Sequence, residues 1–223
     1  MTTSLARRIA LLAWARRARA IVIEDDYDSE FRHRGRPVMS LAGLDDAGCV
    51  IYAGTFSKTM YPGLRIGFAI VPPALVDAYA AGRITAGNPA SILEQDALAA
   101  FIADGQHARH VRRMRVAYRE RAEAFVDALT AACAPALAIG RCDTGMQACA
   151  LLARGSDLRL RDAAAARGIE IGALSDYFIG KPRVRGAVFG FGSVRPAASR
   201  AACRELAQVL DALLTSGQHR SET

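Results

Sequence analysis

The apolar positions of the first half of the chain form short runs separated by helical patterns. The runs at 20–23, 49–53 and 66–71 are rich in β-branched residues and lack alternating polar positions, which is typical of strands buried on both faces of a parallel sheet. A helical pattern over 4–19 precedes the first run, and Pro72 ends the third. We therefore predict an α/β fold with a mainly parallel sheet in this half.

The second half begins with a long helical pattern over 108–132, which ends before Pro135. Shorter elements follow, and we expect them to form a small C-terminal α/β domain: strands near 146–153, 169–171 and 187–189, and helices near 158–167 and 197–215. A helix over 92–103, with a capping box from Ser91 to Glu94, precedes the long helix. We accordingly divide the chain into a domain at 1–107 and a second region at 108–223.

The composition is that of a globular protein, with 223 residues of which 52% are hydrophobic, enough to bury a sizeable core. Arginines interrupt the first helical pattern, so no signal peptide is indicated, and no apolar run is long enough to span a membrane. The five cysteines are an odd number without a C-x-x-C pair, which favours structural thiols over a zinc site or a disulfide framework. We expect a cytoplasmic protein with no metal and no membrane partner.

The net charge of +7 raises the possibility of nucleic-acid binding. Much of the excess, however, lies in the first twenty residues and in the helical segment 109–121. A basic helix alone does not read bases, so a solvated or interdomain face is the favoured interpretation. We expect no DNA binding from this chain alone.

Lys58 is one of only two lysines among 29 Lys and Arg residues, and it lies in the sequence Gly-Thr-Phe-Ser-Lys-Thr after an apolar run. An amine, unlike a guanidinium, can lose its proton, attack a carbonyl and form a Schiff base. A lysine on a surface turn is the alternative for a motif this short. The residues around it decide between the two.

Asp25 and Tyr27 follow the first apolar run, Lys58 lies 33 residues after Asp25, and Arg65 lies seven residues after Lys58. Polar residues just beyond strand ends are where parallel sheets place ligands. A pyridoxal phosphate site needs a lysine to carry the cofactor, a carboxylate for the pyridine nitrogen and a cation with hydroxyl donors for the phosphate. This set of residues contains each of them.

The segments 23–32, 54–59 and 62–67 together resemble the fold-type I pyridoxal phosphate-dependent transferases, and more narrowly the aminotransferase-like domain of MocR-type regulators in the GntR superfamily. The string Asp-Asp-Tyr-Asp-Ser-Glu-Phe is the most specific part. Further stretches near 71–73, 110–115, 174–178 and 189–192 extend the likeness to nearly the whole chain.

Carried over residue by residue, the resemblance makes Lys58 the Schiff-base lysine and Asp25 the partner of the pyridine nitrogen. Asp26 competes for the role of Asp25, but Asp25 has the family's spacing to the lysine and shares a strand side with Tyr27. The other implied cofactor contacts are a donor to the phenolic oxygen, Tyr27, and phosphate neighbours, Thr55, Ser57 and Arg65. Tyr27 could instead be a core aromatic, and Thr55 and Ser57 could be turn hydroxyls.

Two features depart from the family's pattern. The chain resembles only the C-terminal half of the fold, without the winged-helix DNA-binding domain, the phosphate loop and one wall of the cofactor pocket. We therefore expect an uncovered sheet edge with poor solubility or dependence on a partner. Val188 stands where aminotransferases place the arginine for the substrate carboxylate, which leaves Arg183, Arg185 and Arg195 as candidates.

Three functional hypotheses remain open. The first is the effector-sensing module of a transcriptional regulator that lacks its DNA-binding half, the second is an active aminotransferase, and the third is a truncated, non-functional fragment. The resemblance implies a small-molecule amine or amino acid as ligand in the first two, and a homodimer as the assembly.

Overall fold

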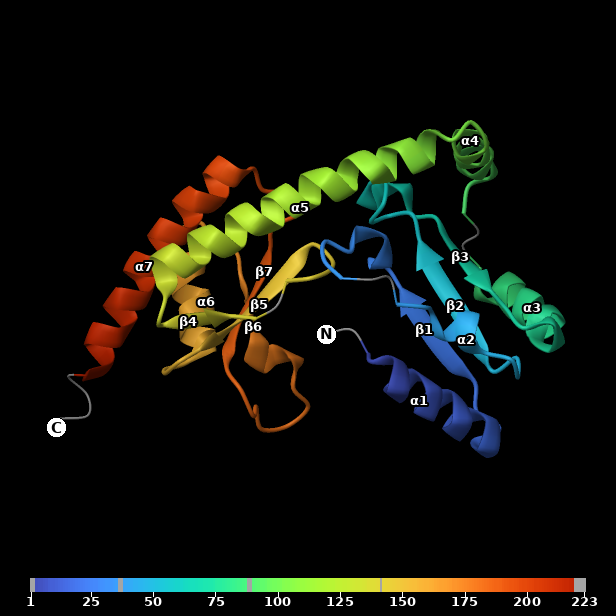
Figure 1. The fold of residues 1–223 in the computed structure, drawn as a ribbon, viewed down its shortest axis with the longest axis horizontal. Helices are drawn as coiled ribbons and strands as arrows, with labels where there is room; N and C mark the ends of the chain where they lie inside the picture. The colour runs from blue at the N-terminus through green and yellow to red at the C-terminus, as the bar shows by residue number, and fades with distance from the viewer. Residues whose placement is uncertain (1–2, 36–37, 88–89, 141, 219–223) are drawn as a thin grey trace. The chain divides into compact units, whose positions relative to one another are not determined.

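The computed structural model describes residues 3–35, 38–87, 90–140 and 142–218. The chain divides into two compact units, Met1–Arg112 and Arg113–Thr223, and the division falls within helix α5, Gln106–Cys133. Each unit contains its own β-sheet (Figure 1).

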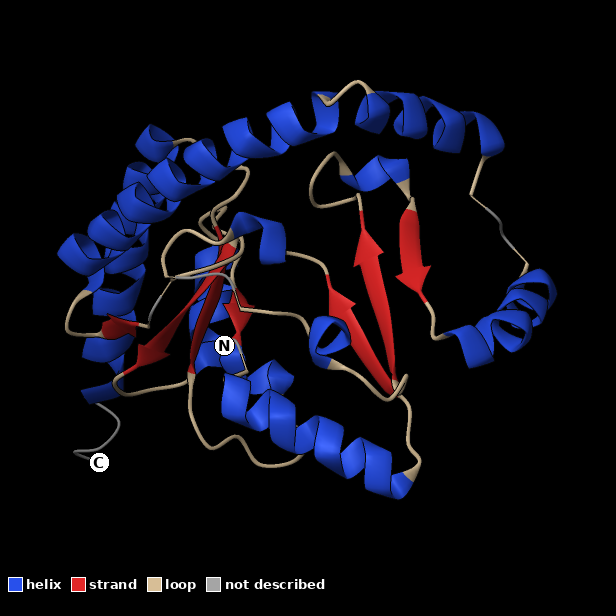
Figure 2. Ribbon diagram, turned by 45° about the vertical axis from the view of Figure 1, so that its right-hand side comes forward, coloured by secondary structure: helices blue, strands red, loops and turns tan. Residues whose placement is uncertain are grey.

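The first unit is built on a three-stranded sheet with the order β1-β2-β3. The helices and strands that precede α5 are, in chain order, α1 (Leu5–Ala18), β1 (Val22–Asp26), α2 (Leu41–Leu44), β2 (Val50–Thr55), β3 (Gly67–Ile70), α3 (Val76–Ala86) and α4 (Ile92–Ala103). β1 and β2 are parallel, with Asp25 opposite Ala53, whereas β3 is antiparallel to β2, with Gly67 opposite Thr55. Figure 2 shows the reversed direction of the third strand. The carboxyl ends of β1 and β2 and the amino end of β3 therefore meet at one end of the sheet.

Helix α1 is defined by a cap at each end. The Ser4 hydroxyl accepts a hydrogen bond from the Arg7 N–H, and Arg19 ends the helix in the left-handed conformation, with φ 52°. Ala15 on this helix is fully buried and packs in a small cluster with Leu41, Cys49 and Val50.

Glu24 of β1 ties the helices of this unit to the sheet. Its carboxylate accepts hydrogen bonds from the N–H groups of Leu41 (2.8 Å) and Ala42 (3.0 Å) at the start of α2. The Arg8 guanidinium of α1 pairs with the same carboxylate at 2.8 Å. Since Glu24 and Asp25 point to opposite faces of β1, these helices cover the face that Asp25 does not use.

The second unit contains a four-stranded antiparallel sheet with the order β4-β5-β7-β6. Its elements after α5 are β4 (Leu137–Ile139), β5 (Gln147–Leu152), α6 (Asp157–Ala165), β6 (Gly172–Ala173), β7 (Gly186–Gly190) and α7 (Pro196–Gln218). One hydrophobic core of seventeen buried residues joins this sheet to the helices, with Phe125, Leu129, Phe191 and Leu206 among its largest members.

Asp157 is the main buried charge of the second unit, with 2% of its surface exposed. Its carboxylate accepts hydrogen bonds from the Ser175 N–H (2.9 Å), the Ser175 hydroxyl (2.7 Å) and the Gly186 N–H (3.1 Å). Burial, the largest single influence, raises the pKa of Asp157, but the hydrogen bonds together outweigh it, and the net shift is downward. The charged carboxylate thus holds the loop before β7 against α6.

Several predicted elements are confirmed and others need correction. α1, α4, α5 and α7 lie where the sequence predicts them, and Val111, Ala122 and Phe125 form the buried stripe of α5. β3 departs from the expected parallel arrangement, and the Ser91 side chain makes no capping hydrogen bond although α4 begins directly after it. The strand predicted at 169–171 is wrong, because the paired residues are those of β6, and β4 was not predicted.

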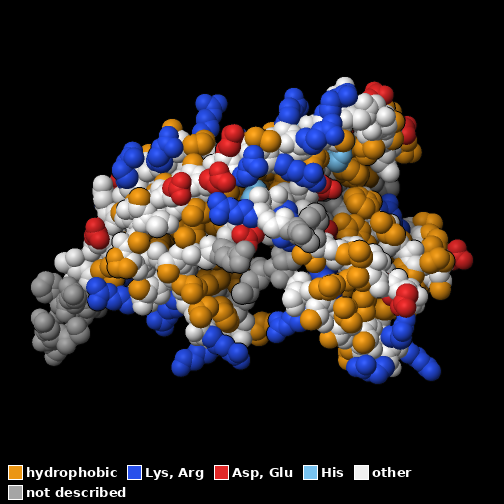
Figure 3. All heavy atoms as spheres, in the orientation of Figure 1, with side chains coloured by type: hydrophobic (Ala, Val, Ile, Leu, Met, Phe, Trp, Pro, Cys, Tyr) orange, Lys and Arg blue, Asp and Glu red, His pale blue; other side chains and the backbone are white. Residues whose placement is uncertain are grey.

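Most arginines of α5 are exposed, as the blue side chains along the upper edge of Figure 3 show. Arg121 is the exception, since it is partly buried and donates a hydrogen bond to the Gly192 carbonyl. This exposure agrees with a solvated basic face. No helix within the described ranges is both long enough and apolar enough to cross a bilayer.

Candidate functional site

The lysine loop, residues 56–66, connects β2 to β3 and carries Lys58 at the end of the first unit's sheet. The Ser57 N–H donates to the Thr55 hydroxyl (3.1 Å), and the Met60 N–H donates to the Phe56 carbonyl (2.8 Å). These bonds fold the start of the loop into a tight turn directly beyond β2. Lys58 is exposed on that turn.

The underside of the lysine loop is anchored in a small core. Phe56 and Met60 pack against a cluster of buried residues, Leu64, Ile66 and Leu98. Thr59, which is 6% exposed, lies 3.2 Å from His107 Nε2 on α5. The residues flanking Lys58 are thus fixed by packing, while the amine itself faces solvent.

Asp28 links Lys58 electrostatically to the loop after β1. Burial, and then the neighbouring Asp26, raise the pKa of Asp28, whereas the positive charge of Lys58 acts in the opposite direction. Among the described residues, no carboxylate lies within ion-pairing distance of the Lys58 amine. The amine therefore approaches the end of β1 without being held in a salt bridge.

Asp25 and Asp26 have different surroundings although they are neighbours. Asp26 accepts hydrogen bonds from the Ser29 N–H (3.1 Å), the Ser29 hydroxyl (2.6 Å) and the Tyr52 hydroxyl (2.8 Å). Asp25 is exposed on the opposite face of β1, next to Ile23, which is 71% exposed. Within the described part of the chain, the Asp25 carboxylate accepts no hydrogen bond. Asp26 holds the turn, and Asp25 is available to a ligand.

Tyr27 continues the Asp25 side of the chain just beyond β1 and is exposed. Its pKa is raised, first by the charge of Asp28, then by burial and by the charge of Asp25. A phenol with a raised pKa keeps its proton at neutral pH and can donate a hydrogen bond.

Arg65 precedes β3 at the same end of the sheet. It is exposed and adopts the left-handed conformation, with φ 53°, which is uncommon for a residue with a side chain. Gly67 follows closely, and a Cβ there would lie 2.9 Å from the Gly54 carbonyl oxygen. The close approach of β2 and β3 at Gly67 thus fixes the chain just after Arg65.

The structure places the six predicted site residues at one end of one sheet, on the last residues of β1 and β2 and on the loops that follow these strands: Asp25, Tyr27, Thr55, Ser57, Lys58 and Arg65. The set offers an amine outside any described salt bridge, an unoccupied carboxylate, two hydroxyls and a guanidinium. The Thr55 hydroxyl also donates a hydrogen bond to the Ile66 carbonyl (3.4 Å) and accepts one from the Ser57 N–H, as a turn hydroxyl does. These side chains match the aldehyde, the pyridine nitrogen and the phosphate of pyridoxal phosphate.

The contacts beneath the site were not predicted from the sequence. Tyr52 orients Asp26, His107 contacts Thr59, and Asp28 lies within electrostatic reach of Lys58. Only Asp28 carried a sequence signal, as a member of the specific acidic string. Tyr52 and His107 act through tertiary contacts that no local motif reports.

The three arginines considered for carboxylate binding differ in their contacts. Arg185 donates a hydrogen bond to the Gly155 carbonyl at 3.1 Å, while Arg183 and Arg195 are exposed. Val188 lies in the middle of β7, opposite Cys149 and Gly172.

Comparison with known proteins identifies the family. The model of aminotransferase class I and II matches residues 5–185. The probable rhizopine catabolism regulatory protein MocR of Rhizobium meliloti is 43% identical over 94% of this chain and 43% of its own length. The resemblance to MocR-type regulators is thereby confirmed.

Solved structures show the same fold. The multiple substrate aminotransferase of Thermococcus profundus superposes with a TM-score of 0.88 at 25% identity, over 97% of this chain and 54% of that protein. The α-aminoadipate aminotransferase LysN of Thermus thermophilus, complexed with N-(5'-phosphopyridoxyl)-L-leucine, gives 0.86 at 25% identity, over 96% and 56%. The predicted fold-type I transferase fold is confirmed.

The chain spans less than half of the MocR sequence that it matches and just over half of each of these two solved chains. The family model nevertheless covers most of its residues, and the structural match extends over nearly all of them. The chain belongs to the aminotransferase class I and II family.

Proposed function

We propose that the chain is a pyridoxal phosphate-binding, aminotransferase-like domain that senses a small-molecule amine or amino acid as part of a MocR-type transcriptional regulator. The observation that carries this proposal is the pairing of an unbonded Asp25 with an exposed Lys58 at one end of the sheet. The 43% identity to MocR favours a regulator over a metabolic enzyme. Given the family, a homodimer is the proposed assembly.

Each site residue has a proposed task. Lys58 would supply the amine to which the cofactor attaches, and the negative charge of Asp25 would keep a proton on the pyridine nitrogen. Tyr27 would donate a hydrogen bond from its phenolic hydroxyl to the ring oxygen, while the hydroxyls of Thr55 and Ser57 and the guanidinium of Arg65 would bind the phosphate. When bound, pyridoxal phosphate supplies an electron sink for the carbon attached to a substrate amine.

The anchoring of the loop supports this assignment. Phe56, Thr59 and Met60 are held by the cluster around Leu98 and by His107, so the backbone on both sides of Lys58 is preorganised. The exposed Lys58 side chain would then be able to bind or release the cofactor while the sheet stays unchanged. Such exchange is what a sensor of amines requires.

A second candidate is an active aminotransferase, and the similarity to two solved aminotransferases favours it. Val188, in place of an arginine that would bind the substrate carboxylate, weighs against it. If the protein transferred amino groups to a keto acid over multiple turnovers, the sensor proposal would be wrong and the chain would be an active aminotransferase.

The test of the proposal uses the two lysines of the chain as target and internal control. The protein is incubated with pyridoxal 5'-phosphate, reduced with borohydride and mapped by peptide mass spectrometry. We expect the pyridoxyl adduct mainly on Lys58 and only background on Lys181, which is exposed in the second unit. Asp25→Asn should lower the Lys58 adduct, whereas Asp77→Asn, an exposed change on α3, should leave it unchanged.

Equal labelling of Lys58 and Lys181 in a folded protein would contradict cofactor binding at this site. Lys58→Ala provides the matched control, because the side chain is exposed and its removal should leave the circular dichroism spectrum intact. Loss of the adduct in that variant, with Lys181 still at background, would support the assignment.

A further inference from the structure

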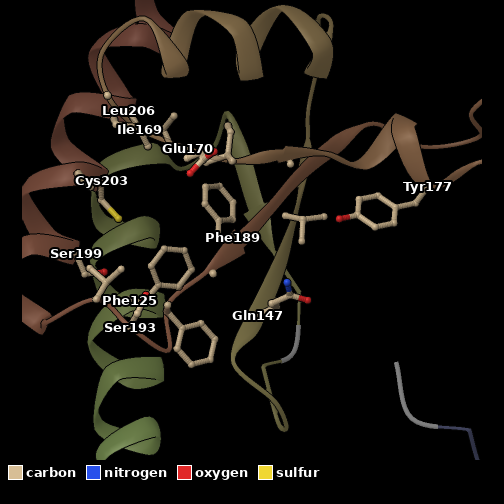
Figure 4. A pocket seen from close by; sticks show the side chains of 18 residues that line it. Phe125, Gln147, Ile169, Glu170, Tyr177, Phe189, Ser193, Ser199, Cys203 and Leu206 are labelled. Carbon is tan, nitrogen blue, oxygen red and sulfur yellow. The ribbon is translucent and has the colours of Figure 1, made fainter. Parts of the chain in front are cut away.

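The second unit contains a cavity that the proposed cofactor site does not use. Its volume is about 590 Å³, within the range of sites that hold small organic ligands. Eighteen residues line it, contributed by α5, the start of β5, the segment 168–172, Tyr177, β7, the loop that follows β7 and the first turns of α7 (Figure 4). All of them belong to Arg113–Thr223.

Three phenyl rings form the apolar part of the cavity. The Phe125 ring lies 5.3 Å from the Phe189 ring and 6.0 Å from the Phe191 ring, measured between centroids. The three rings contact one another in the core and are 6%, 5% and 1% exposed, so only their edges reach the cavity. Ile169 and Leu206 extend this surface.

The cavity also offers two polar groups of different kinds. Ser199, on the first turn of α7, is 5% exposed, and its hydroxyl makes no hydrogen bond with any residue that the structure describes. Glu170 is exposed and lines the same cavity as Phe189, and both are labelled in Figure 4. Of the eighteen described lining residues, only Glu170 carries a charge, and it forms no ion pair with a described residue.

We propose that this cavity is a binding site for a small aromatic amine. The ring packs against the exposed edges of Phe125 and Phe189 beside Ile169, the ammonium group faces the Glu170 carboxylate, and the Ser199 hydroxyl gains a partner. A single negative charge repels carboxylates, so the site selects amines over amino acids and does not depend on Lys58.

The test measures binding to the full chain by isothermal titration calorimetry with two probes. 2-Phenylethylamine carries the ammonium group, and 2-phenylethanol replaces it by a hydroxyl of similar size. We expect a dissociation constant of about 0.5 mM for the amine, the range of an efficient small ligand, and weaker binding of the alcohol. Glu170→Gln should lower the affinity for the amine about fivefold, which is the upper range for an exposed charge pair, and should leave the affinity for the alcohol unchanged.

Two further variants locate the site. Ala202→Phe fills the cavity from α7 and should abolish binding of both probes, with folding checked by circular dichroism. Glu120→Gln removes an exposed charge from α5 outside the cavity and should change neither affinity. The proposal is overturned if the wild-type chain shows no saturable binding, if amine and alcohol bind equally, or if Glu170→Gln leaves the amine affinity unchanged.

Discussion

The two units of the chain bury their hydrophobic side chains in different ways. Residues 113–223 share one core of seventeen buried residues. Among the described residues of 1–112, the buried hydrophobic clusters contain four and three members. Of the exposed large hydrophobic side chains that the structure describes, seventeen lie in the first unit and six in the second. The second unit resembles a self-sufficient domain, whereas the first places its candidate site on loops with shallow support.

This difference suggests how stability and chemistry are distributed. Substitutions in the large core should strongly lower the free energy of unfolding. They should leave the lysine loop intact, because the effects of substitutions are independent where the residues do not contact one another. Substitutions of exposed loop residues in the first unit should change ligand binding and leave unfolding almost unchanged.

The largest expected effect is that of Leu129→Ala in the second unit. Leu129 is fully buried in α5, and its truncation should lower the free energy of unfolding by about 3 kcal/mol. Urea denaturation followed by far-UV circular dichroism should show the loss. Fluorescence of the single tryptophan, Trp14 on α1, should report an unchanged first unit.

The matched control is Val116→Ala on the same helix, where the side chain is 47% exposed. We expect it to change stability by less than about 0.5 kcal/mol. If the fluorescence transition moved together with the dichroism transition in Leu129→Ala, the units would unfold as one body and the comparison would fail.

A smaller effect is expected for Asp157→Asn. The amide cannot accept three hydrogen bonds as a carboxylate does, so unfolding should become easier by about 2 kcal/mol at neutral pH. The folded-state pKa of Asp157 is lowered, so its stabilisation is present above the unfolded value, about 3.9, and disappears as the pH falls through the lower folded value.

Thermal unfolding of both proteins between about pH 2 and 7 checks this prediction. The gap between wild type and Asp157→Asn should close at the acid end. A gap that stayed constant with pH would show that the ionised carboxylate does not stabilise the second unit.

The smallest expected effect separates stability from chemistry within the first unit. Arg65→Gly removes the backbone strain of a left-handed residue that carries a side chain. Glycine also increases the conformational entropy of the unfolded chain, which offsets part of this gain, so the free energy of unfolding should rise by about 0.5 kcal/mol. Arg19→Gly makes the same change at the end of α1, away from the lysine loop.

Both variants should melt slightly higher than the wild type, but only Arg65→Gly should lower the pyridoxyl adduct on Lys58, because it alone removes a proposed phosphate ligand. Equal adduct yields in the two variants would exclude Arg65 from the site.

The sequence predicts those parts of the fold that local periodicity encodes. The stripe of α5 is read from apolar residues at helical spacing, and Phe125 and Ala122 are buried as expected. Strand direction is a tertiary property, so the antiparallel β3 could not be read from its apolar run. β6 is a Gly-Ala pair that forms a strand only because β7 pairs with it, while the more apolar residues 169–171 line the cavity instead.

The candidate site follows the same division. The residue types and their spacing pointed to Lys58, Asp25 and Arg65, since the chemistry requires an amine, a carboxylate and a cation at strand ends. The sequence could rank Asp25 above Asp26 only by family spacing and strand side. Their roles separate physically through Ser29 and Tyr52, which engage one carboxylate and leave the other.

The division between these two aspartates also has an evolutionary consequence. Asp26 is needed for the hydrogen bonds that fold its turn, whereas Asp25 is needed only to bind a ligand. We therefore expect the two positions to evolve under separate constraints. In a descendant that had abandoned the cofactor, we expect residue 25 to vary while residue 26 persists. The identity of residue 25 alone, rather than the acidic pair, would then mark which members of the lineage retain the chemistry.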